Sequence, residues 1–515
     1  MEVSMSGRLA RRAFLTRALA APSALVVGFD PDKRSWVMDG SSGPGVPRGQ
    51  TAPDGGGRPL EGLPRLAGRV SFDEASLDAA ALDNGNIVHR QPRAVLQPAS
   101  VEDIVAMVRY ANRHGLHIAM RGQGHSVYGQ THAEAGIVVD SSTLDRVLHV
   151  ASDSVDAQAG ATWAALNRVT VEKGLTPAVM PDTMTLTVGG GVSVGTWGHT
   201  SHRFGGLVDM VSELDVVTGE GQLVTCSSQR EPELFEMVLA GLGQCALIVR
   251  ARVRLVRAPD RVVRQNLVYE DLDAFYADQQ RLVEDGRFEH LEGRFMKDSG
   301  GRWRPRIEVG SFSASTDAEL AELQRGLRFA SRDAAVRRSY PEYLETKSFV
   351  PLPAEPPERD EMRASRRNPS IVGWLPLSAG QSFIEAHVLG SAAALGDTWV
   401  VASSVMDTTR FTRPLFKMPD ERLAVSFWLF RSAPVDDRRL FEELLASGGD
   451  LIDRMRTVGG KRYPPYGLVR AQSEWEEHYG PDVWQRLVRA KRQFDPNNVL
   501  TPGPGIFTSP PDLKG

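Results

Sequence analysis

The spacing of apolar residues predicts two helices in the first half of the chain. In the first, four apolar residues share one helical face: Ile104, Val105, Val108 and Ala111. Ser100 and Asp103 form a capping-box pattern at its start, and Gly115 marks its end. The second helix is predicted over residues 161–174, where the last residue is again a glycine.

Short apolar runs predict strands between and after these helices. The segments HIAM, residues 117–120, and GIVVDSSTL, residues 136–144, are typical of short strands. Residues 211–227 hold two apolar runs joined by TGEG, which predicts a hairpin. In residues 246–256 apolar residues alternate with arginine, as expected of a strand with one face in solvent.

Glycine-rich segments interrupt this pattern, and its character changes near residue 260. RGQGHS, residues 121–126, is a tight connection, and residues 175–206 hold so many glycines that we expect several close or left-handed turns. Beyond residue 260 charged helical stretches mix with strands, as in residues 269–285, 317–330 and 423–434. A chain of 515 residues is too long for one core, so we expect two domains of the α+β class.

Composition and charge narrow the range of functions. Hydrophobic residues make up 41% and charged residues 24%, as in a globular protein, and no apolar run approaches the roughly 20 residues of a membrane helix. The net charge of −4 provides no large basic field. We therefore expect a small-molecule substrate and no nucleic-acid partner.

The first 65 residues predict a targeting segment and a linker. Arg11 and Arg12 precede a short, weakly apolar stretch, so residues 1–30 are expected to be a twin-arginine signal peptide, although an amphipathic helix fits the same residues. The signal predicts a secreted or periplasmic protein with no stable membrane insertion after its removal. Residues 31–65 are dense in Gly, Pro and Ser, which predicts a disordered linker.

The two cysteines favour a structural role. Cys226 and Cys245 each lie beside an apolar run, and neither has an adjacent histidine or a CxxC partner. We expect two small buried side chains rather than a redox or catalytic pair.

The glycine-rich segments and one histidine are the candidates for chemistry. RGQGHS and TVGGGVSVG, residues 187–195, could direct backbone N–H groups at a pyrophosphate, or be ordinary turns; neither is a Rossmann fingerprint. His125 lies in the first loop, and three further histidines form no recognisable metal motif with it: His132, His199 and His202. Spacing alone predicts no metal site and leaves the role of His125 open.

As an ordered set, these motifs resemble the cytokinin dehydrogenase family, flavoproteins of the vanillyl-alcohol oxidase type. The matches extend from about Pro98 to Phe507 and include RGQGHS, PDTMTLTVGGGVS, ELDVVTGEGQLVTCS, HLEGRF and FDPNNVLTPGPGIF. The resemblance implies a two-domain FAD-binding fold of the α+β class. It places the FAD-binding domain at residues 66–260, an α+β substrate-binding domain at 261–460, and a segment returning to the FAD domain at 461–515.

The resemblance also implies roles for individual residues. His125 would be bonded covalently to the 8α-methyl of FAD. Asp182 matches a catalytic aspartate that takes a proton from the substrate amine while hydride passes to flavin N5, and Glu292 matches a catalytic-site glutamate at the pocket entrance. With Asp182 and His125, the residues expected to contact FAD are Arg121, Gly122, Gln123, Gly124, Ser126, Gln130, Thr187, Gly189, Gly190, Ser193, Ile248 and Tyr463.

From the residues alone, plainer interpretations of these two acids remain. Asp182 could be a turn residue after Pro181, and Glu292 a solvated surface charge. A base beside an apolar flavin is nevertheless chemically reasonable, because desolvation raises the pKa of a carboxylate toward neutrality.

Departures from the family pattern bear on the substrate. The family's H-P-W segment is replaced by Asn368–Ser370, with Trp374 nearby but out of place, and Pro504 stands where the closing P-G-Q has its glutamine. We expect oxidation of N6-isoprenoid adenines (cytokinins) at the C–N bond to the isoprenoid group, which gives adenine and an unsaturated aldehyde. The alternatives are an alcohol substrate, such as a sugar or aryl carbinol, and a flavin-binding protein without turnover, which retention of Asp182 and Glu292 disfavours. Quinone or oxygen would be the electron acceptor.

Overall fold

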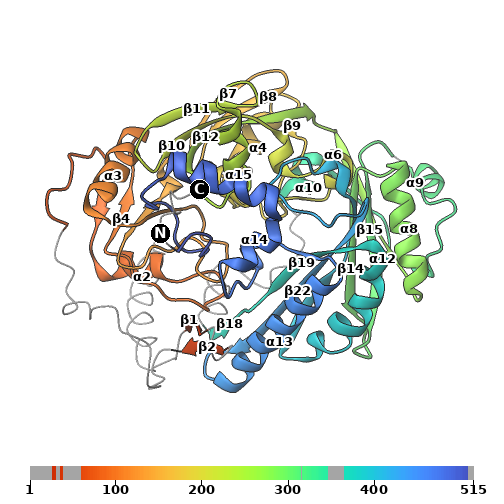
Figure 1. Cartoon of the computed structure of the whole chain (residues 1–515). Coiled ribbons are helices and arrows are strands. Elements are labelled where there is room, and N and C mark those ends of the chain that lie inside the picture. The colour runs from red at the N-terminus through yellow and green to blue at the C-terminus, as the bar shows by residue number, and fades with distance from the viewer. Residues whose placement is uncertain (1–25, 31–34, 39–59, 315, 346–364, 509–515) are drawn as a thin grey trace, which may run out of the picture.

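The computed structural model describes residues 26–30, 35–38, 60–314, 316–345 and 365–508 (Figure 1). Most of the predicted signal peptide and linker lies outside the described residues. Two short segments inside these regions are ordered, which differs from the expectation. They form an antiparallel pair of strands, β1 (Val26–Asp30) and β2 (Ser35–Met38). Leu60, inside the predicted linker, is 5% exposed in a core cluster, so the folded chain begins before residue 66.

The first sheet is small and mixed, and its strand order is β3-β4-β6-β5. Strands β4 and β5 run parallel to β6, while β3 is antiparallel to β4. The predicted strands at 117–120 and 136–144 are confirmed as β5 and β6. The elements of this part are β3 (Arg69–Ser71), α2 (Glu74–Ala81), β4 (Ala94–Gln97), α3 (Val101–His114), β5 (Ile118–Arg121) and β6 (Ile137–Asp140).

Helix α3 forms where the apolar spacing predicts it, but it begins differently. Gly115, with a left-handed φ of 61°, ends the helix. The predicted capping box is wrong, because the side chain of Ser100 makes no cap hydrogen bond. The carboxylate of Asp103 instead accepts hydrogen bonds, at 2.8–2.9 Å, from the backbone N–H groups of Ala67, Gly68 and Ala99. Asp103 therefore ties the segment before β3 to α3.

The second sheet is antiparallel, with strand order β11-β10-β12-β8-β7 and β9 paired to β12. Its strands are β7 (Val147–Val150), β8 (Ser154–Gln158), β9 (Leu175–Pro177), β10 (Val211–Thr218), β11 (Leu223–Ser227) and β12 (Ala246–Arg257). The predicted hairpin at 211–227 is confirmed as β10 and β11. Helices α4 (Trp163–Val171) and α7 (Pro232–Val238) accompany it, and α4 confirms the predicted second helix, although it ends before residue 174. Cys226 and Cys245 are buried and free, as expected.

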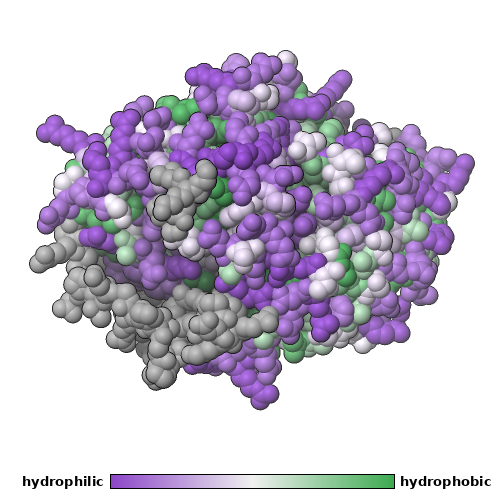
Figure 2. All heavy atoms as spheres, viewed as in Figure 1, coloured by the Kyte–Doolittle hydropathy of each residue, from purple (hydrophilic) through white to green (hydrophobic). Residues whose placement is uncertain are grey.

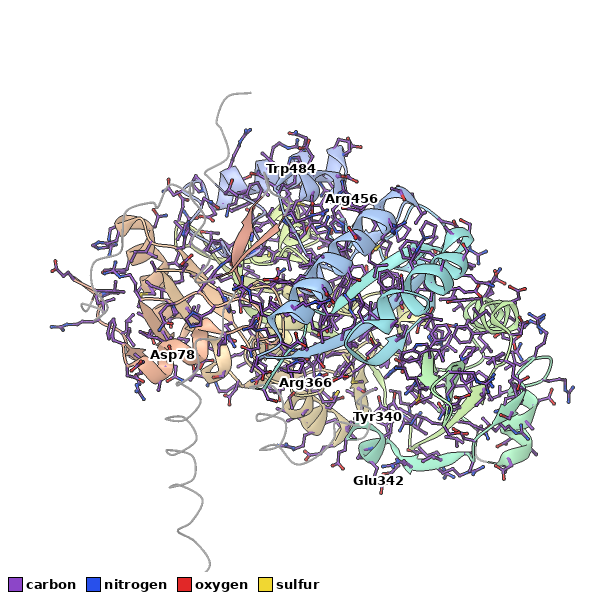
Figure 3. The ribbon with its side chains drawn as sticks, turned by 90° about the horizontal axis from the view of Figure 1, so that it is seen from below. Asp78, Tyr340, Glu342, Arg366, Arg456 and Trp484 are labelled. Carbon is purple, nitrogen blue, oxygen red and sulfur yellow. The ribbon has the colours of Figure 1, made fainter. Side chains whose placement is uncertain are left out.

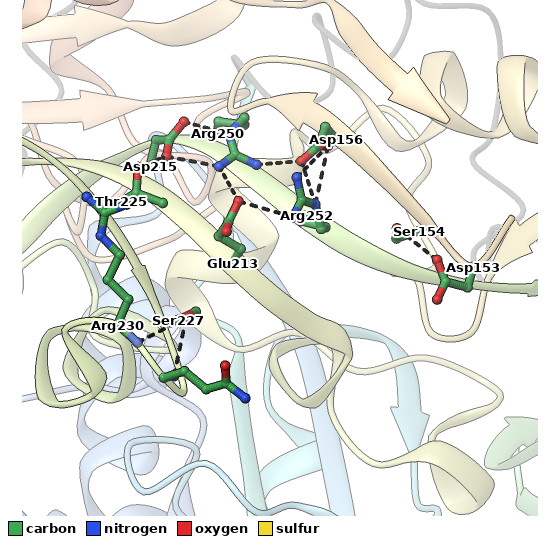
Figure 4. A network of polar contacts seen from close by, with 11 residues as sticks. Asp153, Ser154, Asp156, Glu213, Asp215, Thr225, Ser227, Arg230, Arg250 and Arg252 are labelled. Atoms are coloured by element: carbon green, nitrogen blue, oxygen red, sulfur yellow. Dashed lines mark hydrogen bonds and ion pairs between the residues drawn. The ribbon is translucent and has the colours of Figure 1, made fainter. Parts of the chain in front are cut away.

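Arginines on β12 mark the solvent-facing side of this sheet, as the alternation predicts (Figure 4). Arg250 pairs through Nε with Asp215 at 2.5 Å and through Nη2 with Glu213 at 2.7 Å. Asp156 on β8 bridges Arg250 and Arg252. The charges link three adjacent strands on their open face, while the opposite face packs in the core.

The glycine-rich segment 175–206 is more regular than expected. Residues Val188–Val194 form helix α5, followed by the short helix α6 (Ser201–Phe204). Thr187 caps α5 by accepting a hydrogen bond at Oγ1 from the Gly190 N–H at 3.2 Å. Left-handed φ angles occur only at Gly195 and Gly205 among the residues of this segment. The expectation of close or left-handed turns is confirmed at Gly195 and Gly205 and at the turn in which the Leu186 N–H donates to the Thr183 carbonyl at 3.2 Å, but the sequence did not predict the helix between them.

The second half of the chain is built on one large antiparallel sheet, entered between Arg257 and Arg261. Its main strand order is β16-β13-β15-β14-β20-β22-β19-β23. The strands are β13 (Arg261–Val268), β14 (His290–Lys297), β15 (Trp303–Ser311), β16 (Ser331–Arg332), β17 (Val336–Ser339), β18 (Arg366–Arg367), β19 (Ile371–Pro376), β20 (Asp397–Ala402), β21 (Val405–Asp407), β22 (Leu423–Pro434) and β23 (Lys461–Arg462).

Helices cover this sheet and lead the chain back to the first half (Figure 1). They are α8 (Leu272–Asp285), α9 (Asp317–Leu323), α10 (Tyr340–Glu345), α12 (Leu377–Phe383), α13 (Arg438–Thr457), α14 (Ser473–Tyr479) and α15 (Pro481–Phe494). Arg456, near the end of α13, donates to Glu477 of α14 at 2.9 Å, and Figure 3 shows it on the same side of the molecule as Trp484 of α15. The mixture of helices and sheets in two parts confirms the α+β class.

The exterior is mainly polar on the face drawn in Figure 2, with small apolar groups scattered among hydrophilic residues. Among the described helices, none combines the length and the apolar character required to span a bilayer.

Candidate active site

A cavity open to solvent, with about 1000 Å³ of empty space when its open mouth is included, lies where four segments meet. These segments are the loop after β5, the segment around α5, the start of β12 and the C-terminal segment. The predicted cofactor residues on its wall are Gly122, Gln123, Gly124, His125, Ser126, Gln130, Thr187, Gly189, Gly190, Ser193, Ile248 and Tyr463. Pro504, which stands in place of the family's glutamine, also lines the cavity. Residues distant in sequence are thus brought together around one space.

Glycine backbones make this cavity possible. A Cβ on Gly122 would lie 2.2 Å from Oγ1 of Thr187, and one on Gly189 would lie 2.6 Å from Cβ of Ala159. Gly124 has a left-handed φ of 63°. Larger residues would push the loop and α5 apart, so the close approach of these backbones requires glycine.

The cavity fits a dinucleotide such as FAD. Its walls present backbone from the glycine loop and the start of α5, which suits a pyrophosphate. Nε2 of Gln130 donates to the Pro464 carbonyl at 3.0 Å, while its buried Oε1 has no hydrogen-bond partner among the described residues. A buried acceptor facing a cavity of this size is readily satisfied by a polar ligand.

Arg121 does not line the cavity, and this differs from its predicted role. Its guanidinium donates to the Leu82 carbonyl at 2.8 Å and to the Ala80 carbonyl at 3.2 Å. A Cβ on Gly124 would lie 2.3 Å from Nη2 of this guanidinium. Arg121 therefore supports the glycine loop by joining it to α2.

A second, smaller pocket adjoins the first, with about 270 Å³ of empty space when its opening to solvent is included. Thr196 lines the first cavity and Trp197 lines the second. The ring of Trp197 packs 4.5 Å from that of Tyr463, which belongs to the first. The wall of the second pocket is formed by Asp182, Trp197, Gly198, His199, Leu291, Glu292, Ala402, Ser404, Met406 and Trp428.

Asp182 and Glu292 converge on this pocket through His199. Nε2 of His199 lies 3.0 Å from Oε2 of Glu292, and Nδ1 lies 3.4 Å from Oδ1 of Asp182. Glu292 is 6% exposed, so it is not a solvated surface charge. The two acids predicted for catalysis therefore share one buried cluster with a histidine between them.

The charges around Glu292 favour proton exchange near neutral pH. Burial raises the pKa of Glu292 to about 7, opposed mainly by Arg294, whose Nη2 lies 3.3 Å from its Oε2. Burial likewise acts to raise the pKa of Glu308 on β15, but its ion pairs with Arg294 and Arg264 and its contact with the His290 ring hold that pKa well below its usual range. Glu292 is thus the member of this acid pair that can titrate in the working range of an enzyme.

One nitrogen or oxygen atom from each of His199, His290 and Glu292 lies within 4.8 Å of the others, a spacing that could hold a metal ion. The ring nitrogens of His290 already face the Tyr343 hydroxyl at 2.9 Å and Glu308 at 3.2 Å. Arg294 adds a cation beside Glu292. The cluster is better described as a network of hydrogen bonds and ion pairs than as a metal centre.

Aromatic and apolar side chains form the rest of the pocket. Trp428 on β22 meets Trp197 edge to face, with ring centroids 5.2 Å apart. Trp374, near the position where the family has its pocket tryptophan, is 1% exposed behind Trp197 and is not on the wall. Ser370 is also buried, and its carbonyl accepts a hydrogen bond from the Tyr128 hydroxyl at 3.0 Å. Sequence reasoning missed His199 and Trp428, because the strands that carry their partners are distant in the sequence.

Comparison with known proteins agrees with this geometry. A family model described as an FAD binding domain matches residues 92–227, and one described as cytokinin dehydrogenase 1, FAD and cytokinin binding, matches residues 415–507. An uncharacterized oxidoreductase, ORF5 in the fasciation locus of Rhodococcoides fascians, is 32% identical over 448 residues, which are 85% of this chain and 99% of its own.

Plant relatives show the same extent of similarity. Cytokinin dehydrogenase 5 of Oryza sativa subsp. japonica is 31% identical over 504 residues, covering 87% of this chain and 92% of its own. Cytokinin dehydrogenase 2 of Arabidopsis thaliana is 29% identical over 478 residues, covering 85% and 93%. The protein therefore belongs to the cytokinin dehydrogenase family of FAD-dependent oxidoreductases.

Proposed function

We propose that this protein oxidises N6-isoprenoid adenines at the C–N bond to the isoprenoid group, giving adenine and an unsaturated aldehyde. The observation that carries the proposal is the convergence of Asp182 and Glu292 in a pocket beside the cavity that the glycine loop and α5 line. A carboxylate that can accept a proton is needed at the amine, and an electron acceptor is needed at the adjacent carbon. The arrangement of the two pockets meets both needs.

The protein's own residues perform the proton chemistry. FAD held in the large cavity would supply the hydride acceptor. Asp182 takes the proton from the substrate N–H, and the resulting imine is hydrolysed by water to the two products. Trp197 and Trp428 close the pocket around the substrate and exclude bulk water, which strengthens the interaction between the amine and the carboxylate.

The lining favours a flat aromatic substrate over a sugar. The rings of Trp197 and Trp428 and the side chains of Leu291 and Met406 form an apolar wall. A purine can stack on such a surface, whereas a sugar would need hydrogen-bond partners for each hydroxyl. An aryl carbinol remains the second candidate, because the same apolar wall can also hold its aromatic ring.

Product analysis tests this proposal. Purified protein incubated with N6-isopentenyladenine and a quinone should release adenine and 3-methyl-2-butenal in equal amounts. Benzyl alcohol and glucose serve as comparison substrates. If benzyl alcohol were converted to its aldehyde while the adenine stayed intact, the carbinol function would replace the one proposed.

We also propose that His125 is bonded covalently to FAD. The support is its place on the wall of the large cavity and its match to the family's R-G-x-G-H-S loop. Acid precipitation should leave the yellow colour with the wild-type protein and release it from His125→Ala. Release of all the colour from the wild type would exclude a covalent bond.

Export by a twin-arginine signal is a further part of the proposal, supported by Arg11 and Arg12 alone. A reporter fused after residue 30 should leave the cytoplasm, and the double change Arg11→Lys, Arg12→Lys should retain it there. Equal export of both fusions would contradict the assignment.

A further inference from the structure

His199 is the side chain that joins the two acids of the active site. Its Nε2 faces Glu292 at 3.0 Å and its Nδ1 faces Asp182 at 3.4 Å. Each ring nitrogen therefore meets a different carboxylate. The residue comes from the segment between α5 and α6, so it bridges the first half of the protein and strand β14 of the large sheet.

The surroundings of His199 fix the orientation of its ring. Its backbone carbonyl accepts a hydrogen bond from the Leu291 N–H at 3.1 Å and lies 3.1 Å from Nδ1 of His202. Its ring stacks on that of His290, with centroids 4.0 Å apart. With the backbone and one ring face held, rotation of the imidazole away from the two carboxylates is hindered.

Among the titratable groups around His199, Glu292 is the one that can accept a proton from it near neutral pH. Burial, followed by the proximity of His199, lowers the pKa of His290 to about 3, so His290 stays neutral in the working range. Glu308 is engaged by Arg294 and Arg264, and the Tyr343 hydroxyl faces His290. Among these neighbours, Glu292 combines contact with His199 with a pKa, raised by burial, of about 7.

We propose that His199 is a positioning residue that relays the proton taken by Asp182 to Glu292. The inference rests on the proposed role of Asp182 as the base. Before turnover, Nε2 of His199 carries the ring proton and donates to Glu292, while the Nδ1 lone pair faces Asp182. The separation of 3.4 Å brings Nδ1 near enough to Oδ1 to take up a proton once Asp182 holds one.

The proton moves in two steps, first from the substrate to Asp182 and then through His199 to Glu292. The substrate N–H proton passes to Oδ1 of Asp182, and FAD, when bound, would accept the hydride, with its electron pair, from the adjacent carbon. The proton on Asp182 then moves to Nδ1 of His199 as the Nε2 proton moves to Oε2 of Glu292. Asp182 is again ionised and Glu292 is neutral, so the proton has moved without a change in the charge of His199.

Two variants separate the proton relay from a merely structural role of His199. His199→Asn retains an amide near the place of Nδ1, and His199→Gln retains one near the place of Nε2, but neither amide can relay a proton. We expect both to lower the rate of anaerobic flavin bleaching by N6-isopentenyladenine about tenfold or more. Both should also lose the pH transition near 7 that Glu292 gives the wild type, and Glu292→Gln should lose it as well.

His202→Asn is the matched control, because His202 lies on the same segment, is equally buried and contacts backbone carbonyls rather than carboxylates. It should lower stability and keep the pH transition. A His199 variant that bleaches at the wild-type rate, or slows while keeping the transition, would overturn the relay and leave His199 a structural residue.

A readout without turnover keeps this test separate from the proposed function. In the substrate-free holoenzyme, the infrared band of a protonated carboxyl that Glu292→Gln removes should titrate near pH 7, and both His199 variants should shift that titration. An unshifted titration would overturn the coupling. If wild-type flavin is not bleached by the adenine, the proposed substrate fails, while the infrared titration still decides the coupling.

Discussion

At the scale of single residues, the active site depends on contacts that no local pattern encodes. The HLEGRF segment identified Glu292 by family resemblance, but its burial and its contact with His199 arise from the packing of β14 against the segment before α6. Asp182 and His199 are close in sequence, yet their separation gives no metal or catalytic motif. Sequence could therefore nominate the two acids but not the histidine between them.

The buried state of Glu292 has a consequence for stability. Its pKa is raised from 4.5 to about 7, so between these values the folded protein binds this proton more tightly than the unfolded chain does. The contribution of Glu292 to stability is full below pH 4.5 and is lost as pH rises through 7, with each unit of pKa difference corresponding to about 1.4 kcal/mol.

Denaturant unfolding of the wild type and Glu292→Gln at a series of pH values measures this effect. The difference in unfolding free energy between them should change, in favour of the variant, from pH 4.5 to pH 7. A pH-independent difference would mean that Glu292 is not desolvated in the folded protein.

At the scale of elements, the glycine patterns predicted where the cavity lies better than they predicted the secondary structure of the segments that line it. The strand at 117–120, the glycine loop after it and the α3 helix follow from local spacing and are confirmed. The segment after Thr187 was expected to turn but forms α5, because a threonine cap and close packing on Ala159 favour a glycine-containing helix. The conformation of this segment depends on its packing against Ala159, a residue outside the segment, so local sequence could not predict it.

Cofactor content tests the glycine packing. Gly122→Ala would place a Cβ 2.2 Å from Oγ1 of Thr187, so the loop and α5 must separate and bound FAD should fall severalfold. Gly449→Ala in α13, where the nearest atom to the added Cβ would be 3.7 Å away, is the control and should keep full flavin content. The flavin-to-protein absorbance ratio reports both, and equal ratios would refute the packing argument.

At the scale of the whole molecule, the C-terminal segment holds the two halves of the site together. It supplies Tyr463 and Pro504 to the cofactor cavity and follows the last strand of the large sheet. Lys491 and Asp495 anchor it, since both are fully buried, with Nζ and Oδ2 2.6 Å apart. Nζ also donates to the Gln244 carbonyl at 2.9 Å, ahead of β12. The FDPNN segment is visible in the sequence, but the burial of this ion pair is not.

Breaking the pair should destabilise the fold strongly. Lys491→Met leaves the Asp495 carboxylate buried without its cation, which typically costs about 3–5 kcal/mol. Adding Asp495→Asn removes that charge and should recover part of the loss, because the amide oxygen can still accept from the N–H of Val499 or Leu500. Chemical denaturation of both variants measures this, and a loss under about 1 kcal/mol in the single variant would show that the segment is held by other contacts.

Anaerobic reduction of the flavin by N6-isopentenyladenine tests the central claim most directly. In a stopped-flow experiment the oxidised flavin band of the wild type should bleach in a single turnover, and Asp182→Asn should slow bleaching by about 10²-fold or more while retaining its flavin. Equal rates in the two proteins would show that Asp182 is not the base, and a wild-type flavin that stays oxidised would contradict cytokinin oxidation by this protein.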